Sequence, residues 1–203
     1  MAAKRRAALG ALVAMLALAG CRAPLPLRSN GTDQLAQRRA ALAALPSWGY
    51  NGRAALSDGK DAVTVRIAWQ QQGERYELTL RAPISGETWR LSGDSDGATL
   101  EGGGRPARHE RDAEALLQRE SGYRVPIAAL ADWSRGLSHD WRRASVALNA
   151  EGLAETIDEA GWLIHLRDYD QQQDPPLPLG LEAERRPYRV RLAIAAWRRA
   201  PNE

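Results

Sequence analysis

Apolar and polar residues alternate along much of this chain, which is typical of antiparallel β-strands with one buried face and one wet face. The alternation is clearest between residues 48 and 80, where turns at 57–61 and 70–74 separate three segments. Similar segments recur as far as residue 197, and we count about eleven in all. The apolar positions of the first three segments are Trp48, Tyr50, Ala54 and Leu56, then Val63, Val65, Ile67 and Trp69, then Tyr76, Leu78 and Leu80.

Helical patterns occur at the start and in the middle of this series of strands. The first helix is predicted over residues 33–45 with Thr32 as its cap and Pro46 after it. The second follows Asp112 and ends at Gly122, and the third opens at Pro126 and ends at Gly136. A curved sheet with one apolar face needs a cover. The helical residues that could supply it are Leu116, Leu117, Ile127, Leu130 and Trp133.

The first twenty residues differ in composition from the rest. Basic residues at 4–6 precede an apolar stretch that is too short to span a membrane and ends in the sequence LAGC at residues 18–21. This ending resembles the bacterial lipobox, in which cleavage leaves a lipid-carrying cysteine as the first residue. Cys21 is the only cysteine, so it has no disulfide partner within the chain. We predict a signal peptide over residues 1–20, a lipid-anchored tether over 21–31 and a single domain over 32–203; the alternative is an ordinary cleaved signal with a chance cysteine.

The balance of charge argues against nucleic-acid binding. The chain has 28 Lys and Arg against 25 Asp and Glu, and the three basic residues at 4–6 account for the difference. Proteins that bind nucleic acid normally gather a basic excess on one face. The C-terminal arginines are instead interspersed with Ala, Leu and Val, which suggests strand faces: Arg185, Arg186, Arg189, Arg191, Arg198 and Arg199.

Motifs that carry catalysis or bind metals are incomplete in this sequence. His109 begins HERDA, which lacks the second histidine of a zinc protease, and DSDG at Asp94 is too short for a calcium loop. The sequence GGGRP lacks the lysine of a phosphate-binding loop. His139 and Asp140 have no nucleophile motif to complete a triad. We therefore expect no catalytic site, no metal site and no cofactor.

One turn contains a residue that turn chemistry does not explain. Residues 78–91 have the pattern of strand, turn and strand, with Pro83, Ser85 and Gly86 in the turn. Ile84 lies among them, although a β-branched aliphatic residue has no backbone reason to be there. Since exposed aliphatic residues are common, Ile84 is either an accident of a tolerant loop or a point of contact with something apolar.

The order of several motifs resembles the LolB family, outer-membrane lipoprotein receptors of Gram-negative bacteria. The resemblance begins with the lipobox Cys21 and spans nearly all of the chain that would follow cleavage. The family implies an unclosed antiparallel β-barrel of eleven strands, covered by helices and enclosing a hydrophobic cavity for the acyl chains of other lipoproteins. The matching stretches are WGYNGRAAL, ERYELTLRAPISGETWRLSG, DAEALLQRESGYRVPIAALADWSRGL, EAGWLIHLRDY and LPLGLEAERRPYRVRLAIAAW.

The resemblance also implies partners, a location and site residues. The donor would be a LolA-like periplasmic carrier, and the cargo would pass into outer-membrane lipid. The protein would be a periplasm-facing monomer, and Arg22 would permit outer-membrane sorting because the best-known retention signal is Asp at that position. Pro83 and Ile84 match a loop that touches the membrane, although the family's usual Pro-Leu-Gly is Pro-Ile-Ser-Gly here. The cavity residues implied are Trp69, Tyr76, Leu78, Leu80, Trp89, Leu91, Leu116, Leu130, Trp133 and Ile164.

Periodicity alone leaves two alternatives open. The apolar positions could fill an ordinary packed core, because protein interiors are normally close-packed. The chain could then be a structural lipoprotein that binds a protein partner through a sheet edge, the turn at Ile84 or its C-terminal arginines. A periplasmic hydrolase is the third hypothesis, and it has no catalytic constellation to support it.

Overall fold

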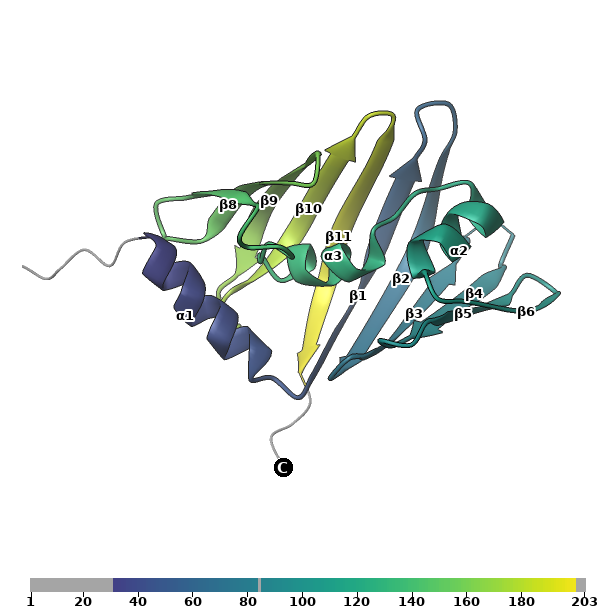
Figure 1. Ribbon diagram of the computed structural model, residues 1–203, viewed down its shortest axis with the longest axis horizontal. Coiled ribbons are helices and arrows are strands. Elements are labelled where there is room, and N and C mark those ends of the chain that lie inside the picture. Colours follow the sequence, from purple (N-terminus) through teal and green to yellow (C-terminus); the bar gives the residue numbers. More distant parts are fainter. Residues whose placement is uncertain (1–30, 84, 200–203) are drawn as a thin grey trace, which may run out of the picture. The chain divides into compact units, whose positions relative to one another are not determined.

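A computed structural model describes residues 31–83 and 85–199 (Figure 1). Residues 31–203 form one compact unit by themselves. The predicted lipidation site Cys21 and the predicted membrane-contact residue Ile84 lie outside the described residues. None of the helices in the described ranges is long and apolar enough to cross a membrane. The helices are α1 (Gly31–Ala43), α2 (Ala113–Ser121) and α3 (Ile127–Ser134), and the strands are β1 (Ser47–Ser57), β2 (Ala62–Gln72), β3 (Arg75–Arg81), β4 (Thr88–Gly93), β5 (Ala98–Gly102), β6 (Arg105–Glu110), β7 (Ser145–Leu148), β8 (Ala154–Glu159), β9 (Trp162–Asp170), β10 (Leu177–Arg185) and β11 (Tyr188–Arg199).

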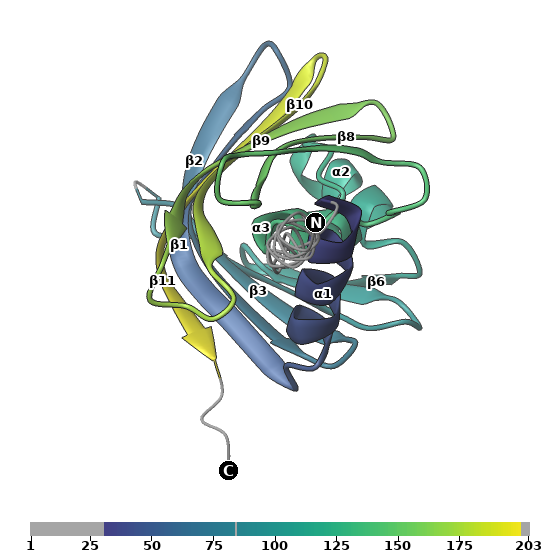
Figure 2. The same ribbon diagram turned by 90° about the vertical axis from the view of Figure 1, so that its left-hand side faces the viewer.

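All eleven strands belong to one antiparallel sheet in the order β6-β5-β4-β3-β2-β1-β11-β10-β9-β8-β7. Each strand pairs with its neighbours in sequence, except that β1 and β11 pair with each other in the middle. The edge strands β6 and β7 do not pair, so the curved sheet stays open. Figure 2 shows the sheet curving around α1 and α3. The predicted fold, an unclosed antiparallel β structure of about eleven strands with covering helices, is confirmed.

The alternation of residue types becomes an alternation of burial. In β2, Val65, Ile67 and Trp69 are buried, whereas Thr64 before them and Arg66 between them are exposed. The same alternation holds for β9, where the buried positions begin at Trp162. The apolar faces of these strands therefore form the concave face of the sheet, and the helices lie on that side (Figure 2).

Four aromatic rings fill the centre of the concave face, where β2, β1 and β11 lie side by side. Trp48 and Trp69 are stacked with ring centroids 5.9 Å apart, and Tyr50 meets Trp197 edge-on at 5.2 Å. Gly52 of β1 allows close pairing with β11, since a Cβ there would come within 2.2 Å of the Ala193 carbonyl oxygen. This cluster gives the sheet a firmly packed centre.

The helix ends agree with the sequence signals except in α1. The Asp112 side chain accepts hydrogen bonds from the backbone N–H groups of Glu114 and Ala115, and Gly122 ends α2 with φ of 80°. Helix α1 was predicted to begin after Thr32 and end at residue 45, but it begins at Gly31 and ends at Ala43. The earlier end has a physical reason, because Pro46 disfavours helical geometry in the residue before it.

Candidate functional site

A narrow cavity of about 20 Å³ lies between the sheet and the helices α2 and α3. This volume is close to what a single water-sized probe needs. Every residue around it is apolar, so nothing there would hold a water by hydrogen bonds. The lining residues are Ala54, Leu56, Ile67, Leu78, Leu80, Leu117, Val125, Ile127, Leu130, Val190 and Leu192.

A larger groove of about 650 Å³ opens at the end of the strands where β2 turns into β3. It is lined by residues of α1, α3, β2 and β3 and of the turn after β4. The lining is mixed: the large rings of Trp48, Trp69 and Tyr76 stand beside the polar side chains of Gln71, Glu74, Asp94, Ser95, Asp132, Arg135 and His139. Burial raises the pKa of Tyr76 to about 12, so its hydroxyl stays neutral. Ile127 of α3 lines both this groove and the narrow cavity. The two spaces are therefore neighbours that share one apolar side chain of a short helix.

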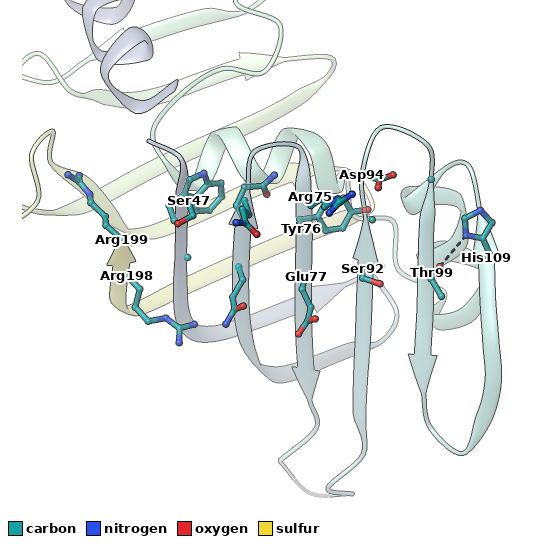
Figure 3. A pocket seen from close by; sticks show the side chains of 17 residues that line it. Ser47, Arg75, Tyr76, Glu77, Ser92, Asp94, Thr99, His109, Arg198 and Arg199 are labelled. Atoms are coloured by element: carbon teal, nitrogen blue, oxygen red, sulfur yellow. Dashed lines mark hydrogen bonds between the residues drawn. The ribbon is translucent and has the colours of Figure 1, made fainter. Parts of the chain in front are cut away.

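A second pocket lies at the same end of the strands and has a different character. Figure 3 shows that its labelled side chains are almost all polar, from Arg198 and Arg199 at one side to His109 at the other. Its volume is about 750 Å³. The imidazole Nδ1 of His109 lies 3.1 Å from the Thr99 hydroxyl oxygen. This lining suits water or a polar partner better than a hydrocarbon chain.

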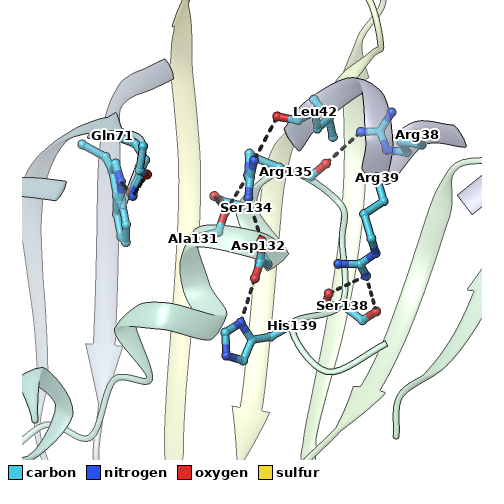
Figure 4. A network of polar contacts seen from close by, with 12 residues as sticks. Arg38, Arg39, Leu42, Gln71, Ala131, Asp132, Ser134, Arg135, Ser138 and His139 are labelled. Carbon is cyan, nitrogen blue, oxygen red and sulfur yellow. Dashed lines mark hydrogen bonds and ion pairs between the residues drawn. The ribbon is translucent and has the colours of Figure 1, made fainter. Parts of the chain in front are cut away.

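Arginines tie the helical cover together through backbone carbonyls (Figure 4). From α1, the Arg38 guanidinium donates to the carbonyl oxygens of Arg135 at 2.8 Å and Pro176 at 2.5 Å. The neighbouring Arg39 donates to the carbonyl oxygen of Ser138 at 2.7 Å. In the other direction, Arg135 donates to the carbonyl oxygen of Leu42 at 3.4 Å. We call Arg38, Arg39 and Arg135 the arginine latch.

Arg38 is the member of the arginine latch whose burial is partly unfavourable. Arg38 is 7% exposed, and its Nε and Nη1 atoms have no hydrogen-bond partner. Burial lowers the pKa of Arg38, because the charged form loses its hydration. Arg135 has more favourable partners than Arg38. Its Nη2 lies 2.6 Å from the Asp132 carboxylate, and its guanidinium carbon lies 4.7 Å from the centroid of the Trp48 ring.

A buried carboxylate fixes α3 to the sheet. Glu159 at the end of β8 is 4% exposed and accepts a hydrogen bond from the Trp133 indole N–H at 2.8 Å. It also accepts from the backbone N–H groups of His139, at 2.9 Å, and Asp140. A buried charge is tolerated when donors surround it in this way. Glu159 thus fixes both α3 and the segment that follows it.

The sequence-predicted cavity residues do not gather around a single space in this conformation. Leu78, Leu80 and Leu130 line the narrow cavity, and Trp69 and Tyr76 line the groove. Trp133 packs against Trp162 with ring centroids 5.8 Å apart, and Trp89 lies half-buried against the backbone of Gly103. The remaining three are fully buried elsewhere in the core: Leu91, Leu116 and Ile164.

Most residues around the narrow cavity were missing from the predicted site. Some of them had a usable signal, since Ala54, Leu56 and Ile67 occupy the same alternating positions as predicted neighbours in the sheet. Val190 and Leu192 come from β11, which is distant in sequence and adjacent to β1 only in the fold. Their assignment needed the pairing of the first and last strands.

The described residues of the connection between β3 and β4 are held by backbone hydrogen bonds. The Ala82 N–H donates to the Glu87 carbonyl oxygen at 2.9 Å, and Gly86 has φ of 72°. Pro83 is exposed. The turn lies at the opposite end of the strands from the groove, because Arg81 pairs with Arg66 whereas Gly73 turns the other end.

The C-terminal arginines belong partly to ion pairs on strands. Arg189 lies 3.0 Å from the Glu184 carboxylate, and Arg191 lies 3.1 Å from that of Glu182. The hydrogen bond from Arg191 lowers the pKa of Glu182. Within the described ranges, no group of three or more His, Cys, Asp or Glu side chains is placed to hold a metal ion.

Comparisons with known proteins agree with this architecture. The family model of the outer membrane lipoprotein LolB matches residues 46–197. The outer-membrane lipoprotein LolB of Xylella fastidiosa strain 9a5c is 37% identical over 197 residues, covering 92% of this chain and 90% of the relative. That of Alkalilimnicola ehrlichii is 35% identical over 161 residues, covering 79% of this chain and 80% of the relative.

A solved structure shares the fold without a close sequence. It is a domain from Vibrio parahaemolyticus assigned to outer membrane lipoprotein sorting, with a TM-score of 0.50 and 10% identity. The alignment covers 86% of this chain and 95% of that domain. Since the family model spans most of the chain and the sequence relatives exceed 30% identity over most of their length, this chain belongs to the LolB family of outer membrane lipoproteins, a family of lipoprotein localisation and transport.

Proposed function

We propose that this protein is an outer-membrane-anchored receptor that takes lipoproteins from a LolA-like periplasmic carrier and delivers them to the outer membrane. The acyl chains of the cargo enter between the sheet and the helical cover. Cys21 carries the lipid that anchors the protein, and the domain faces the periplasm. Pro83 and Ile84 touch the bilayer during delivery.

The observation that carries this proposal is the relation between the groove and the narrow cavity. The groove has a volume typical of ligand sites and carries large rings among its lining residues, and the neighbouring narrow cavity is lined only by hydrocarbon side chains. Ile127 is the shared wall. A shift of α3 that moves Ile127 would join the two spaces into one apolar channel above the sheet.

The arrangement also favours release. Each buried CH₂ group contributes about 0.8 kcal/mol whether it lies in the protein or in a bilayer. In the protein, however, acyl chains must separate groups that are packed against each other in this conformation. The bilayer imposes no such cost, so the cargo moves downhill from receptor to membrane without nucleotide.

Transfer of cargo tests the proposal. Residues 21–203 carrying Cys21→Ala are incubated with a LolA–lipoprotein complex, and cargo is then followed by its co-purification with each protein. We expect the cargo to move to this protein. Ile127→Glu should block uptake by placing a charge at the shared wall, whereas the exposed Leu163→Glu on β9 should not. The proposal would be refuted if the protein without a substitution at Ile127 took up no cargo.

A second candidate function is supported by the small size of the cavity. A fully packed interior would suit a structural lipoprotein that binds a protein partner without taking up lipid. A fluorescent fatty acid separates the two functions. A receptor should bind this probe in a saturable way, and Ile127→Glu should abolish the binding. A protein with a solid core would not bind the probe, with or without the substitution.

A further inference from the structure

Trp141 is the most exposed large apolar side chain in the described part of the molecule. It is 60% exposed, and the only other exposed large apolar side chain there is Leu163, at 44%. Trp141 lies in the segment between α3 and β7. Neither the groove nor the narrow cavity uses it, so its exposure has no explanation in the proposed acyl-chain path.

Two arginines accompany the exposed indole. The guanidinium carbon of Arg142 lies 5.2 Å from the centroid of the Trp141 ring. The Arg143 side chain is 87% exposed, and its Nε is 3.6 Å from the Asp140 carboxylate, which is itself half-exposed. We call Trp141, Arg142 and Arg143 the Trp141 corner. It combines an amphipathic ring with two cations, and Asp140 beside it supplies one acid, so the local charge is basic overall.

The Trp141 corner lies beside the helix that continues from the N-terminal tether. Trp141 lines a mostly apolar groove of about 550 Å³ with Leu35, Ala36 and Ala40 of α1. Gly31, the first residue of α1, lies against Leu148 at the end of β7, since a Cβ on Gly31 would come within 2.9 Å of that side chain. Strand β7 and α1 therefore run next to each other, with the corner along the same side.

The length of the chain before α1 limits how far this side can be from the anchor. Gly31 is ten positions after Cys21, and ten steps along the chain span at most about 35 Å when fully extended. A protein anchored at Cys21 therefore keeps the start of α1 within that distance of the bilayer surface. Trp141 shares a groove with Leu35 and Ala36, which lie in the first half of the same helix.

We infer that the Trp141 corner is a membrane contact that binds the headgroup layer of anionic phospholipids. This inference rests on the lipid anchoring included in the proposed function. Indole rings prefer the membrane–water interface, with the ring against acyl chains and the N–H in the headgroups. Arginine pairs with phosphate through its planar guanidinium. The contact would be distinct from the predicted one at Pro83 and Ile84, so two points would orient the protein on the bilayer.

Vesicle binding tests the inference. Residues 21–203 with Cys21→Ala are mixed with vesicles of phosphatidylethanolamine and phosphatidylglycerol, and the bound fraction is measured by sedimentation. Trp141→Ala should lower the partition coefficient by about tenfold, the loss expected for one large apolar side chain. Arg142→Ala and Arg143→Ala should each lower it by about fivefold. The effect of the arginines should shrink in vesicles of phosphatidylcholine alone and at high salt.

Matched controls come from the outer face of the sheet. Leu163→Ala removes the other exposed large apolar side chain, and Arg66→Ala removes an exposed arginine of β2; both should leave binding unchanged. Equal binding by Trp141→Ala and the unaltered protein would overturn the inference. A second result would also overturn it: Trp141→Ala binds vesicles normally but no longer receives cargo from the carrier in vesicle-free solution. The Trp141 corner would then bind the carrier. The vesicle assay uses no cargo, so failure of cargo uptake would refute the proposed function without affecting this result.

Discussion

The centre of the sheet and the helical cover are held by different forces. The aromatic cluster of Trp48, Tyr50, Trp69 and Trp197 is buried and ring-packed, on strands paired along their length. The C-terminal half of α1 is held by the arginine latch, whose acceptors are mainly backbone carbonyl oxygens. Hydrogen bonds can be exchanged for water at little net cost, whereas packed rings cannot. We therefore expect α1 to separate from its neighbours more readily than the strands separate from one another.

Breaking the sheet should have the largest effect. Trp69→Ala removes a fully buried ring from the centre of the cluster, and the cavity it leaves should lower the free energy of unfolding by about 3–5 kcal/mol. Urea denaturation measures this loss. Trp141→Ala is the matched control, and we expect it to change stability by less than about 0.5 kcal/mol because the ring is exposed. Similar losses for both variants would contradict a firm aromatic centre.

Removing the carboxylate beneath α3 should have the next largest effect. Glu159→Ala leaves the Trp133 indole N–H and two backbone N–H groups without their acceptor, which should lower the free energy of unfolding by about 1–3 kcal/mol. Glu159→Gln keeps one acceptor oxygen and should lose less. If hydrogen exchange of α3 were unchanged in Glu159→Ala, Glu159 would not be the anchor of that helix.

Loosening the latch should change opening more than stability. Arg39→Ala removes hydrogen bonds to the carbonyl and hydroxyl oxygens of Ser138, at a cost of about 1 kcal/mol in unfolding free energy. Uptake of a fluorescent fatty acid should become faster, as seen by stopped-flow mixing. Arg66→Ala, on the outer face, should leave the rate unchanged. Slower uptake of the fatty acid by Arg39→Ala would contradict this, because the latch would then be needed to form the binding space and would not restrict access to it.

The smallest effect should appear in the pH dependence of the cover. His139 Nδ1 lies 2.7 Å from the Asp132 carboxylate, and this hydrogen bond raises the pKa of His139. A raised pKa in the folded state adds stability below the unfolded value of about 6.5, and that stability is lost as the pH rises through the folded pKa. Melting temperatures of the unaltered protein should therefore fall slightly over this range, and those of His139→Gln should not. Parallel curves would exclude the contribution of His139.

The fold could be predicted further than the site because alternation is a local signal. Val65, Ile67 and Trp69 reveal a buried face without any knowledge of the rest of the chain, and Asp112 and Gly122 mark the ends of a helix. Strand β7 is only four residues long, Ser145–Leu148, and half of its positions are exposed. A strand this short carries too little alternation to be identified individually.

The site depends on contacts that have no local signature. Arg38 and Arg39 bind carbonyl oxygens about a hundred residues away, and any residue type can supply such an acceptor. The shared wall at Ile127 depends on how α3 crosses the sheet. Periodicity predicted the apolar faces correctly, but it could not distinguish a packed interior from an open one. The structure has a narrow apolar cavity next to a larger groove.

Covalent mapping tests directly whether the acyl chains of the cargo lie between the sheet and the helical cover. Leucines can be replaced by their near-isosteric diazirine analogue, the protein loaded with cargo from the carrier and irradiated, and the linked residues identified by mass spectrometry. The account predicts that acyl chains link to leucines around the narrow cavity, including Leu78, Leu80, Leu130 and Leu192, and not to Leu163 on the outer face. Successful loading with no links to the cavity leucines, or with equal links to Leu163, would contradict it.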